Sequence, residues 1–159
     1  MDYLGIDGSK KGWVIAIINS KTLTLFWIEC LTELKLNKND SILIDMPITL
    51  PTTITHYPRQ SDILAKKYLG RRHSCIFYAP VLFWLSQSYE CINVYCETHQ
   101  KPKLSKQSFY LIPKITETLR FKKLHDYIFI KEHHPELIFM YWNANNCLPS
   151  KHSMLGKLF

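Results

Sequence analysis

The first 45 residues alternate between short hydrophobic runs and turn-forming residues, which predicts four β-strands. The runs are Tyr3–Asp7, Trp13–Ile18, Thr22–Ile28 and Ser41–Asp45. The Trp13–Ile18 run is apolar throughout, as expected for a strand that is covered on both faces. Because only short turns separate the first three runs, they are expected to form an antiparallel meander.

Beyond residue 45 the hydrophobic positions change to helical spacing. Met46–Pro51 contains two prolines, which remove backbone donors, and is expected to be a rigid loop. The elements predicted after it are a helix over Gln60–Leu69 that ends at Gly70, a helix from Pro80 to Tyr89, a helix from Ser105 to Phe121 that Pro113 disturbs, a strand over Tyr127–Ile130 and a helix over Pro135–Trp142. A meander followed by strands that alternate with helices predicts one α/β or α+β sheet domain over residues 1–159.

The charge of the chain is basic and unevenly distributed. The 159 residues carry 20 Lys and Arg against 13 Asp and Glu, a formal net charge of +7. Residues 57–131 hold thirteen of the basic and five of the acidic residues, whereas the two ends are close to neutral. This distribution suits a polyanionic partner such as nucleic acid.

Three classes of protein are disfavoured by simple features of the sequence. The longest strongly apolar stretch, Ile76–Leu85, is shorter than the roughly 20 residues of a membrane-spanning helix and contains Pro80. Asp2 follows Met1 without an apolar signal segment, so a cytoplasmic protein is expected. The five cysteines form no CxxC pair, which favours reduced, mostly buried thiols over a zinc ribbon or a disulfide framework.

Three carboxylates follow predicted strands. Asp7 ends the first strand, Asp45 ends the fourth, and Glu136 lies just after the fifth. If these strands are neighbours, the three side chains meet at one edge of the sheet, where sites in open α/β sheets lie. Clustered carboxylates either raise their own pKa values or bind a cation, and oxygen ligands suit Mg²⁺ or Mn²⁺. The alternative is that each is a turn residue at a strand end, for which Asp7 before Gly8 is well suited.

Basic residues accompany this candidate metal site. Arg59, Arg71, Arg72 and Lys114 lie where predicted helices begin or where loops return toward the carboxylate edge. Arginine binds phosphate in a bidentate manner and lysine binds it as a point charge, so this set beside a metal site suits a phosphodiester. The alternative is surface ion pairing, for example of Arg59 with Asp62.

Other catalytic arrangements have less support. Neither a G-x-S-x-G elbow nor a P-loop surrounds Ser9. His133, His134 and Glu136 could ligate a metal, but no second His/Cys group has matching spacing. His134 is therefore interpreted as a polar cap at a strand-to-helix turn.

The candidate residues lie within seven short sequence blocks that follow one another along the chain. The blocks are Gly5–Trp13, Ile44–Pro51, Arg59 with Asp62, Leu69–Phe77 with Ala79–Pro80, Leu104–Gln107, Pro113–Ile115 with Glu117, and His134–Glu136, before Lys151 and Gly156. No single block is specific to one protein family, but the seven blocks in this order are. Together, from Leu4 to about Lys157, they resemble the family catalogued as domain of unknown function 429, whose members are described as predicted nucleases of RNase H-like fold.

The resemblance implies an RNase H-like, five-stranded mixed sheet with flanking helices. It implies that Asp7 and Asp45, with Glu136 as third ligand, hold Mg²⁺ or Mn²⁺ for phosphodiester hydrolysis of nucleic acid. The phosphate-binding residues that it implies are Lys10, Arg59, Arg71, Arg72, Gln107 and Lys114. Because a fold does not establish an activity, the alternative is a catalytically incomplete nucleic-acid-binding domain of the same fold.

The resemblance also implies a short C-terminus. Members of the family continue into a further helical segment, which in this fold usually supplies the last metal ligand, whereas this chain ends at Phe159. Without that segment, one face of the sheet is expected to expose an apolar patch that a two-fold dimer would bury.

A third hypothesis is a small-molecule phosphate enzyme. Ile6–Ser9 before a hairpin is also typical of the phosphate loop of sugar kinases and actin-like ATPases. The length of the chain disfavours this hypothesis, because that architecture needs two such domains with a nucleotide site between them.

Overall fold

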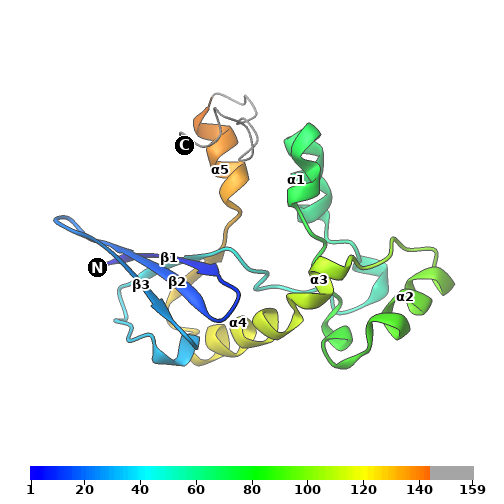
Figure 1. Ribbon diagram of the computed structural model, residues 1–159, viewed down its shortest axis with the longest axis horizontal. Helices are drawn as coiled ribbons and strands as arrows, with labels where there is room; N and C mark the ends of the chain where they lie inside the picture. The colour runs from blue at the N-terminus through cyan, green and yellow to red at the C-terminus, as the bar shows by residue number, and fades with distance from the viewer. Residues whose placement is uncertain (144–159) are drawn as a thin grey trace.

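A five-stranded mixed sheet forms one part of the molecule (Figure 1). The structure, a computed structural model, describes residues 1–143. The strands are β1 (Tyr3–Gly8), β2 (Trp13–Ile18), β3 (Leu23–Ile28), β4 (Ser41–Ile44) and β5 (Phe129–Glu132), in the order β3-β2-β1-β4-β5. The first three strands pair antiparallel, and β4 pairs parallel with both β1 and β5. The expected α/β fold with an antiparallel meander is thus confirmed.

The helices are α1 (Gln60–Leu69), α2 (Tyr89–Thr98), α3 (Lys106–Tyr110), α4 (Ile112–Leu124) and α5 (Pro135–Trp142), with short 3₁₀ turns η1 (Leu31–Glu33), η2 (Ile54–His56), η3 (Gly70–Cys75) and η4 (Leu82–Ser86). α4 lies below the sheet, α5 rises above it, and α1, α2 and α3 lie beside it (Figure 1). The bounds predicted for α1 and α5 are confirmed. Gly70 follows α1 with a φ of +52°, a backbone angle that favours glycine at a helix end.

Two of the predicted elements differ from the structure. The helix expected from Pro80 to Tyr89 is wrong, because only η4 forms there and α2 begins at Tyr89, where the Ser88 side chain accepts a hydrogen bond from the Cys91 backbone N–H. The strand expected over Tyr127–Ile130 lies two residues later. The helix predicted from Ser105 does break near Pro113, which occupies the first turn of α4 as proline can.

Within residues 1–143, a helix packs against only one face of the sheet. Alternate residues of β1 and β4, such as Ile6 and Ile44, are buried against α4, which contributes Ile115 to the same core. Figure 1 shows α4 beneath the sheet. The opposite face of β2 is half-exposed, with Val14 42% exposed. The expectation that this strand is covered on both faces is therefore wrong.

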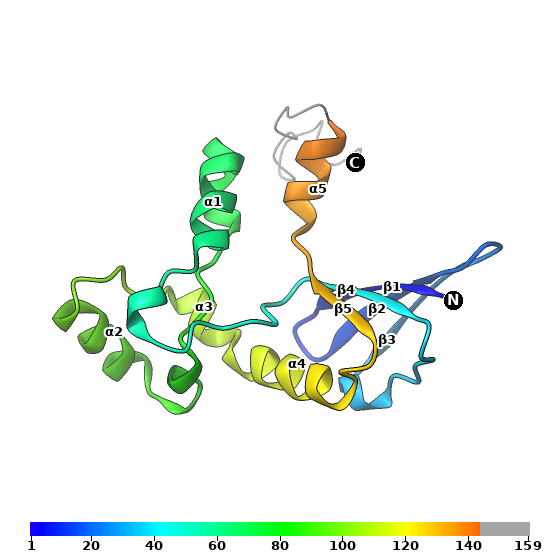
Figure 2. The same ribbon diagram turned by 180° about the vertical axis from the view of Figure 1, so that it is seen from behind.

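A second, smaller core lies in the helical part beside the sheet (Figure 2). Trp84 and Tyr57 are completely or almost completely buried there, with ring centroids 4.8 Å apart in an edge-to-face arrangement. α4 joins the two parts, because Ile112 at its start belongs to the helical core and Ile115 to the sheet core.

The turn between β1 and β2 is fixed by contacts with distant elements. The Glu117 carboxylate on α4 accepts hydrogen bonds from Trp13 Nε1 at 3.0 Å and from the Leu31 backbone N–H at 2.7 Å. Gly12 is buried directly against β3, where an added Cβ would lie 2.2 Å from the Ile28 carbonyl oxygen. These contacts set the end of β1, which carries Asp7.

Three further expectations concern the C-terminal end of the chain, the cysteines and membrane-spanning helices. The blocks at Lys151 and Gly156, and the apolar end at Phe159, lie outside the described residues. Of the four cysteines in the described part of the chain, all are unpaired but only Cys96 is buried, so the expectation of mostly buried thiols is wrong there. No helix over residues 1–143 is long and apolar enough to cross a membrane.

We expect Gly12→Ala to destabilise the protein by at least about 2 kcal/mol, because rigid backbone must move to admit the methyl group. Gly5→Ala is the matched control, since its Cβ would meet only the Ala16 side chain at an ordinary 3.8 Å. Urea unfolding measures both changes. Equal effects at the two glycines would contradict this account of the turn.

Candidate functional site

Asp7 and Asp45 lie side by side on neighbouring parallel strands. β1 and β4 are in register at Ile6 and Ile44, and the Asp45 backbone N–H donates to the Ile6 carbonyl at 2.9 Å. Successive side chains alternate between faces, so both carboxylates point away from the core face that buries Ile6 and Ile44. The expected convergence of these two acids at one sheet edge is thus present.

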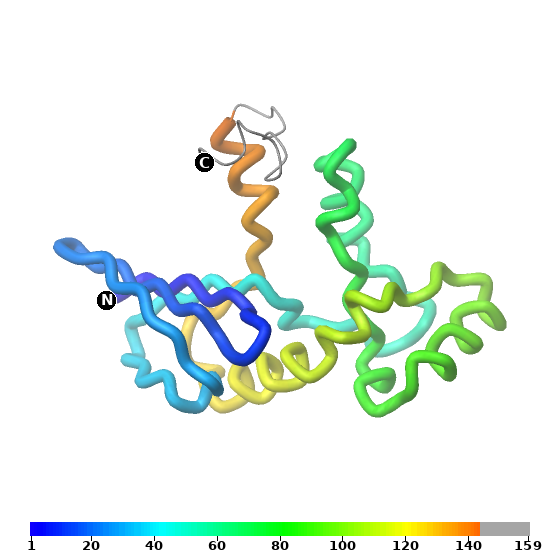
Figure 3. Tube along the Cα trace, in the orientation of Figure 1, coloured from blue at the N-terminus to red at the C-terminus, as the bar shows by residue number. Residues whose placement is uncertain are grey.

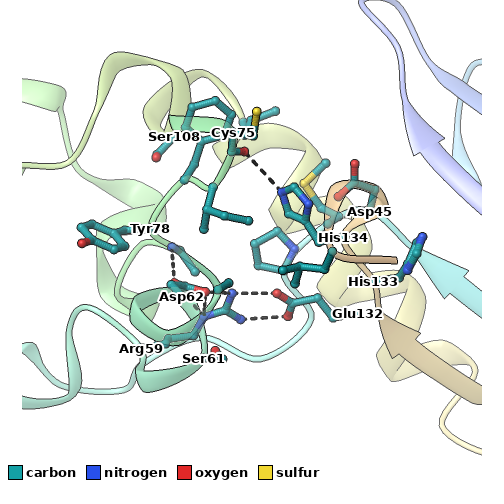
Figure 4. A pocket seen from close by; sticks show the side chains of 18 of the residues that line it. Asp45, Arg59, Ser61, Asp62, Cys75, Tyr78, Ser108, Glu132, His133 and His134 are labelled. Carbon is teal, nitrogen blue, oxygen red and sulfur yellow. Dashed lines mark hydrogen bonds and ion pairs between the residues drawn. The ribbon is translucent and has the colours of Figure 1, made fainter. Parts of the chain in front are cut away.

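The two carboxylates open into a cleft of about 830 Å³. The cleft lies between the ends of β1, β4 and β5 and the α1–η3 segment, with the start of α5 on its border (Figure 4). Its titratable residues near the sheet are Asp7, Asp45, Glu132, His133, His134 and Glu136. Acidic side chains therefore dominate the wall formed by the sheet.

Asp45 is the electrostatically perturbed carboxylate of this cleft. Burial raises its pKa to about 6, and the charges of Asp7, Glu136 and Glu132 act in the same direction, against the opposing effect of His134. A half-buried carboxylate among other acids favours a bound cation. Asp7 is exposed at the cleft mouth and lies close enough to contribute to this effect.

His134 and Glu136 form a pair beside Asp45. His134 Nδ1 lies 3.2 Å from Glu136 Oε2, and its Nε2 lies 3.3 Å from the Cys75 carbonyl oxygen. Since an acceptor faces each ring nitrogen, the doubly protonated ring is favoured. Burial alone would lower the pKa of His134, but Glu136 and Asp45 outweigh it and raise that pKa. The contact with His134, supported by Arg72, lowers the pKa of Glu136 to about 2.

Arg59 joins the helical part to the end of the sheet. Its guanidinium donates to both oxygens of Glu132 on β5, at 2.7 and 2.8 Å, and to the Thr49 carbonyl at 2.8 Å. Nε and the remaining N–H donate to Asp62, which is 4% exposed and also accepts from the Ala79 backbone N–H. Arg59 does pair with Asp62, as the alternative expected, but the pair is largely buried rather than at the surface. All five N–H donors have acceptors within the protein, so a phosphate would have to displace one.

The other residues expected to bind phosphate are spread over α4, η3, α3 and the turn between β1 and β2. Lys114 on α4 donates to the Gly12 carbonyl at 2.7 Å and lies over the Trp13 ring, beside the turn that carries exposed Lys10. Arg71 and Arg72 lie on η3, and Gln107 is exposed on α3. Of the six, all within the described residues, only Arg59 lines the cleft.

The donor set fits a hydrated hard cation rather than a closed metal cage. Within residues 1–143 no group of three Asp, Glu, His or Cys side chains is arranged to hold an ion. Mg²⁺ commonly uses one or two carboxylates and keeps several waters, which Asp7 and Asp45 could provide at the open cleft mouth. Glu136, the expected third ligand, has its carboxylate engaged by His134 and, at 3.7 Å, by Arg72.

Two parts of the site escaped sequence reasoning. The expectation that His134 is a polar cap is wrong, because its side chain makes no cap hydrogen bond at the start of α5 and turns into the cleft next to Asp45 (Figure 4). The sequence His134-Pro135-Glu136, which places an acid one residue beyond a proline at a helix start, is the signal that could have indicated the pair. Glu132 had no such signal, because its partner Arg59 is distant in the sequence.

The fold and this cleft define an α/β protein with an acidic site at the ends of parallel strands. The family model described as "Protein of unknown function (DUF429)" matches residues 5–158, nearly the whole chain. The chain therefore belongs to the DUF429 family. Searches of the curated proteins and of the solved structures found no significant match.

We expect Arg59→Met to destabilise the protein by about 3–5 kcal/mol, because it leaves the buried Asp62 carboxylate and Glu132 without their partner. Urea unfolding measures the change. Arg120→Met on the exposed side of α4 is the matched control and should stay within about 0.5 kcal/mol. Similar losses in the two variants would show that Arg59 does not join the two parts.

We expect Glu136→Gln to lower the pKa of His134, because burial then acts with less opposition. NMR titration of the ring proton measures this pKa in the wild type and the variant. In the wild type the pair stabilises the fold fully between about pH 4.5 and 6.5. This stabilisation is lost as pH rises through the raised pKa of His134, and also as pH falls through the lowered pKa of Glu136, about 2. His133 is the internal control, and its pKa should not be lower in the variant than in the wild type.

Proposed function

We propose that this chain is a divalent-metal-dependent phosphodiesterase that hydrolyses nucleic acid. The observation that carries the proposal is the position of Asp7 and Asp45, adjacent on parallel strands and facing the same cleft. This pair of carboxylates on a rigid sheet edge is a suitable platform for Mg²⁺ or Mn²⁺. The resemblance of the sequence blocks to predicted nucleases of RNase H-like fold supports the same assignment.

Asp7 and Asp45 would hold the ion, and Glu136 stays a candidate third ligand. When bound, the ion supplies positive charge to the phosphodiester and lowers the pKa of the attacking water. The ionised form of Asp45 is needed for this task. Since its pKa without metal is about 6, protons compete with the ion below that pH.

His134 would act as a proton donor in this reaction. Its pKa is raised, mainly by Glu136 and Asp45 against the effect of burial, which favours the protonated ring, and it lies beside Asp45 at the cleft. Glu136 orients the ring from one side and the Cys75 carbonyl from the other. A proton delivered from His134 would stabilise the oxygen that leaves the phosphorus.

Nucleic acid is the substrate class that the charge distribution supports best. The basic excess between residues 57 and 131 includes Arg71 and Arg72 on η3, which borders the cleft. The carboxylate wall would repel a polyanion by itself, so the approach of a phosphate depends on the bound cation and on these flanking charges.

We expect Asp7→Asn and Asp45→Asn each to abolish stabilisation by Mg²⁺ or Mn²⁺ and to reduce cleavage of DNA or RNA by at least about a hundredfold. Thermal unfolding with and without metal, and cleavage of labelled single- and double-stranded substrates, measure the two effects. The metal-induced stabilisation should fade as pH falls through about 6, because protonated Asp45 does not bind the ion.

The matched control is Asp126→Asn, an exposed acid in the loop before β5, which should behave like the wild type. Cleavage that survives both Asp7→Asn and Asp45→Asn would overturn the proposal. Salt-dependent binding of nucleic acid without cleavage in any metal would instead favour the catalytically incomplete binding domain.

A further inference from the structure

The sheet face opposite α4 carries Asp7 and Asp45 at one edge and Lys131 on β5, but its other large side chains are apolar, and no described part of the chain covers them. These apolar side chains, each between 41% and 66% exposed, are Tyr3, Val14, Ile18, Leu23, Leu25, Trp27, Leu43 and Phe129. The strand register makes the patch continuous, because Tyr3, Ile18 and Leu23 form one row across three strands. Figure 3 shows that the β2–β3 hairpin projects beyond the rest of the sheet.

The area of this face matches one side of a stable protein–protein interface. At roughly 100 Å² for each half-exposed side chain, the patch presents on the order of 800 Å² of apolar surface, close to the share of one partner in a standard interface. Apolar patches on monomers rarely exceed a few hundred Å².

The same chain carries a second unburied apolar element, the helix α5. Apart from Glu136 in its first turn, every residue of Pro135–Trp142 is apolar or aromatic, and none is buried. Exposure increases toward its end, where Tyr141 is 72% and Trp142 73% exposed. A helix that is apolar on all sides is normally found inside a core.

Polar contacts connect the base of α5 to η3. His134 is held by the Cys75 carbonyl and Glu136 by Arg72, both on η3, and α5 runs alongside α1. Figures 1 and 2 show α5 rising from the sheet on the side opposite α4, which is the side of the open face. α5 therefore projects into the space above the open face, where it can contact a partner that covers this face.

We propose that a second copy of this chain covers the open face, and that the C-terminal turn of α5 from each copy packs on the sheet of the other. A two-fold axis makes the two contacts identical, so one apolar helix end and one apolar face satisfy each other twice. The sheet of each copy then has a layer on both sides, as a mixed α/β sheet normally has. This proposal does not rest on the phosphodiesterase activity.

Sedimentation equilibrium of the full chain tests the proposal. The wild type should be a dimer, and Leu25→Lys should raise the dissociation constant at least about 100-fold, since the charge enters both symmetric contacts. Leu23→Lys, at an equally exposed position, should behave in the same way. Leu124→Lys on α4 is the matched control, because Leu124 is 64% exposed against 66% for Leu25, and it should leave the dimer intact.

A mixing experiment separates exchange of α5 from simple stacking of two faces. Trp142→Lys alone should also dissociate the dimer. An equimolar mixture of the Trp142→Lys and Leu25→Lys variants should form heterodimers. In these, the unmodified α5 of the Leu25→Lys chain meets the unmodified sheet face of the Trp142→Lys chain. A monomeric wild type, an unaffected Leu25→Lys variant or the absence of heterodimers would each overturn the proposal. Circular dichroism confirms that each variant is folded.

Discussion

The arrangement of the molecule depends on one buried ionic interaction, the contact of Arg59 with Asp62 and Glu132. Asp62 lies in the first helix of the helical part, and Glu132 ends the last strand of the sheet. Burial of Asp62 is tolerable only because the guanidinium and the Ala79 backbone N–H satisfy it. The cleft lies between the two parts that this interaction joins, and Arg59 lines it.

The acidic wall of the cleft is a consequence of strand pairing rather than of any local motif. Asp7 and Asp45 are brought together because β1 and β4 pair in parallel, with equivalent residues at the same height. His133 continues this row, since its backbone N–H donates to the Ile44 carbonyl at the end of β5. Asp7 near the end of β1 and Asp45 just after β4 thus face the same cleft, and the charge of each acts on the other.

The strands and the two acids could be predicted because each run of apolar residues stops on a polar one. What could not be predicted depends on contacts between distant segments. The Pro80 segment resembles a helix, but Trp84 and its neighbours pack into the helical core as a 3₁₀ turn, and Ser88 caps the helix that follows. The Trp13–Ile18 strand is apolar on both sides, and its composition alone could not say which face a helix covers.

The order of the strands also governs how the chain can fold. Ile44 on β4 pairs with Glu132 on β5, so the entire helical part must be synthesised between two strands that are neighbours in the sheet. Such long-range parallel pairing is slow, because the entropy of closing the loop is lost before the contact forms. Until β5 has paired with it, β4 is an edge strand with exposed Leu43 on one face. Such an edge is a template for wrong pairing with another chain. The joining of β5 by way of α4 is therefore the step at which correct folding and aggregation compete.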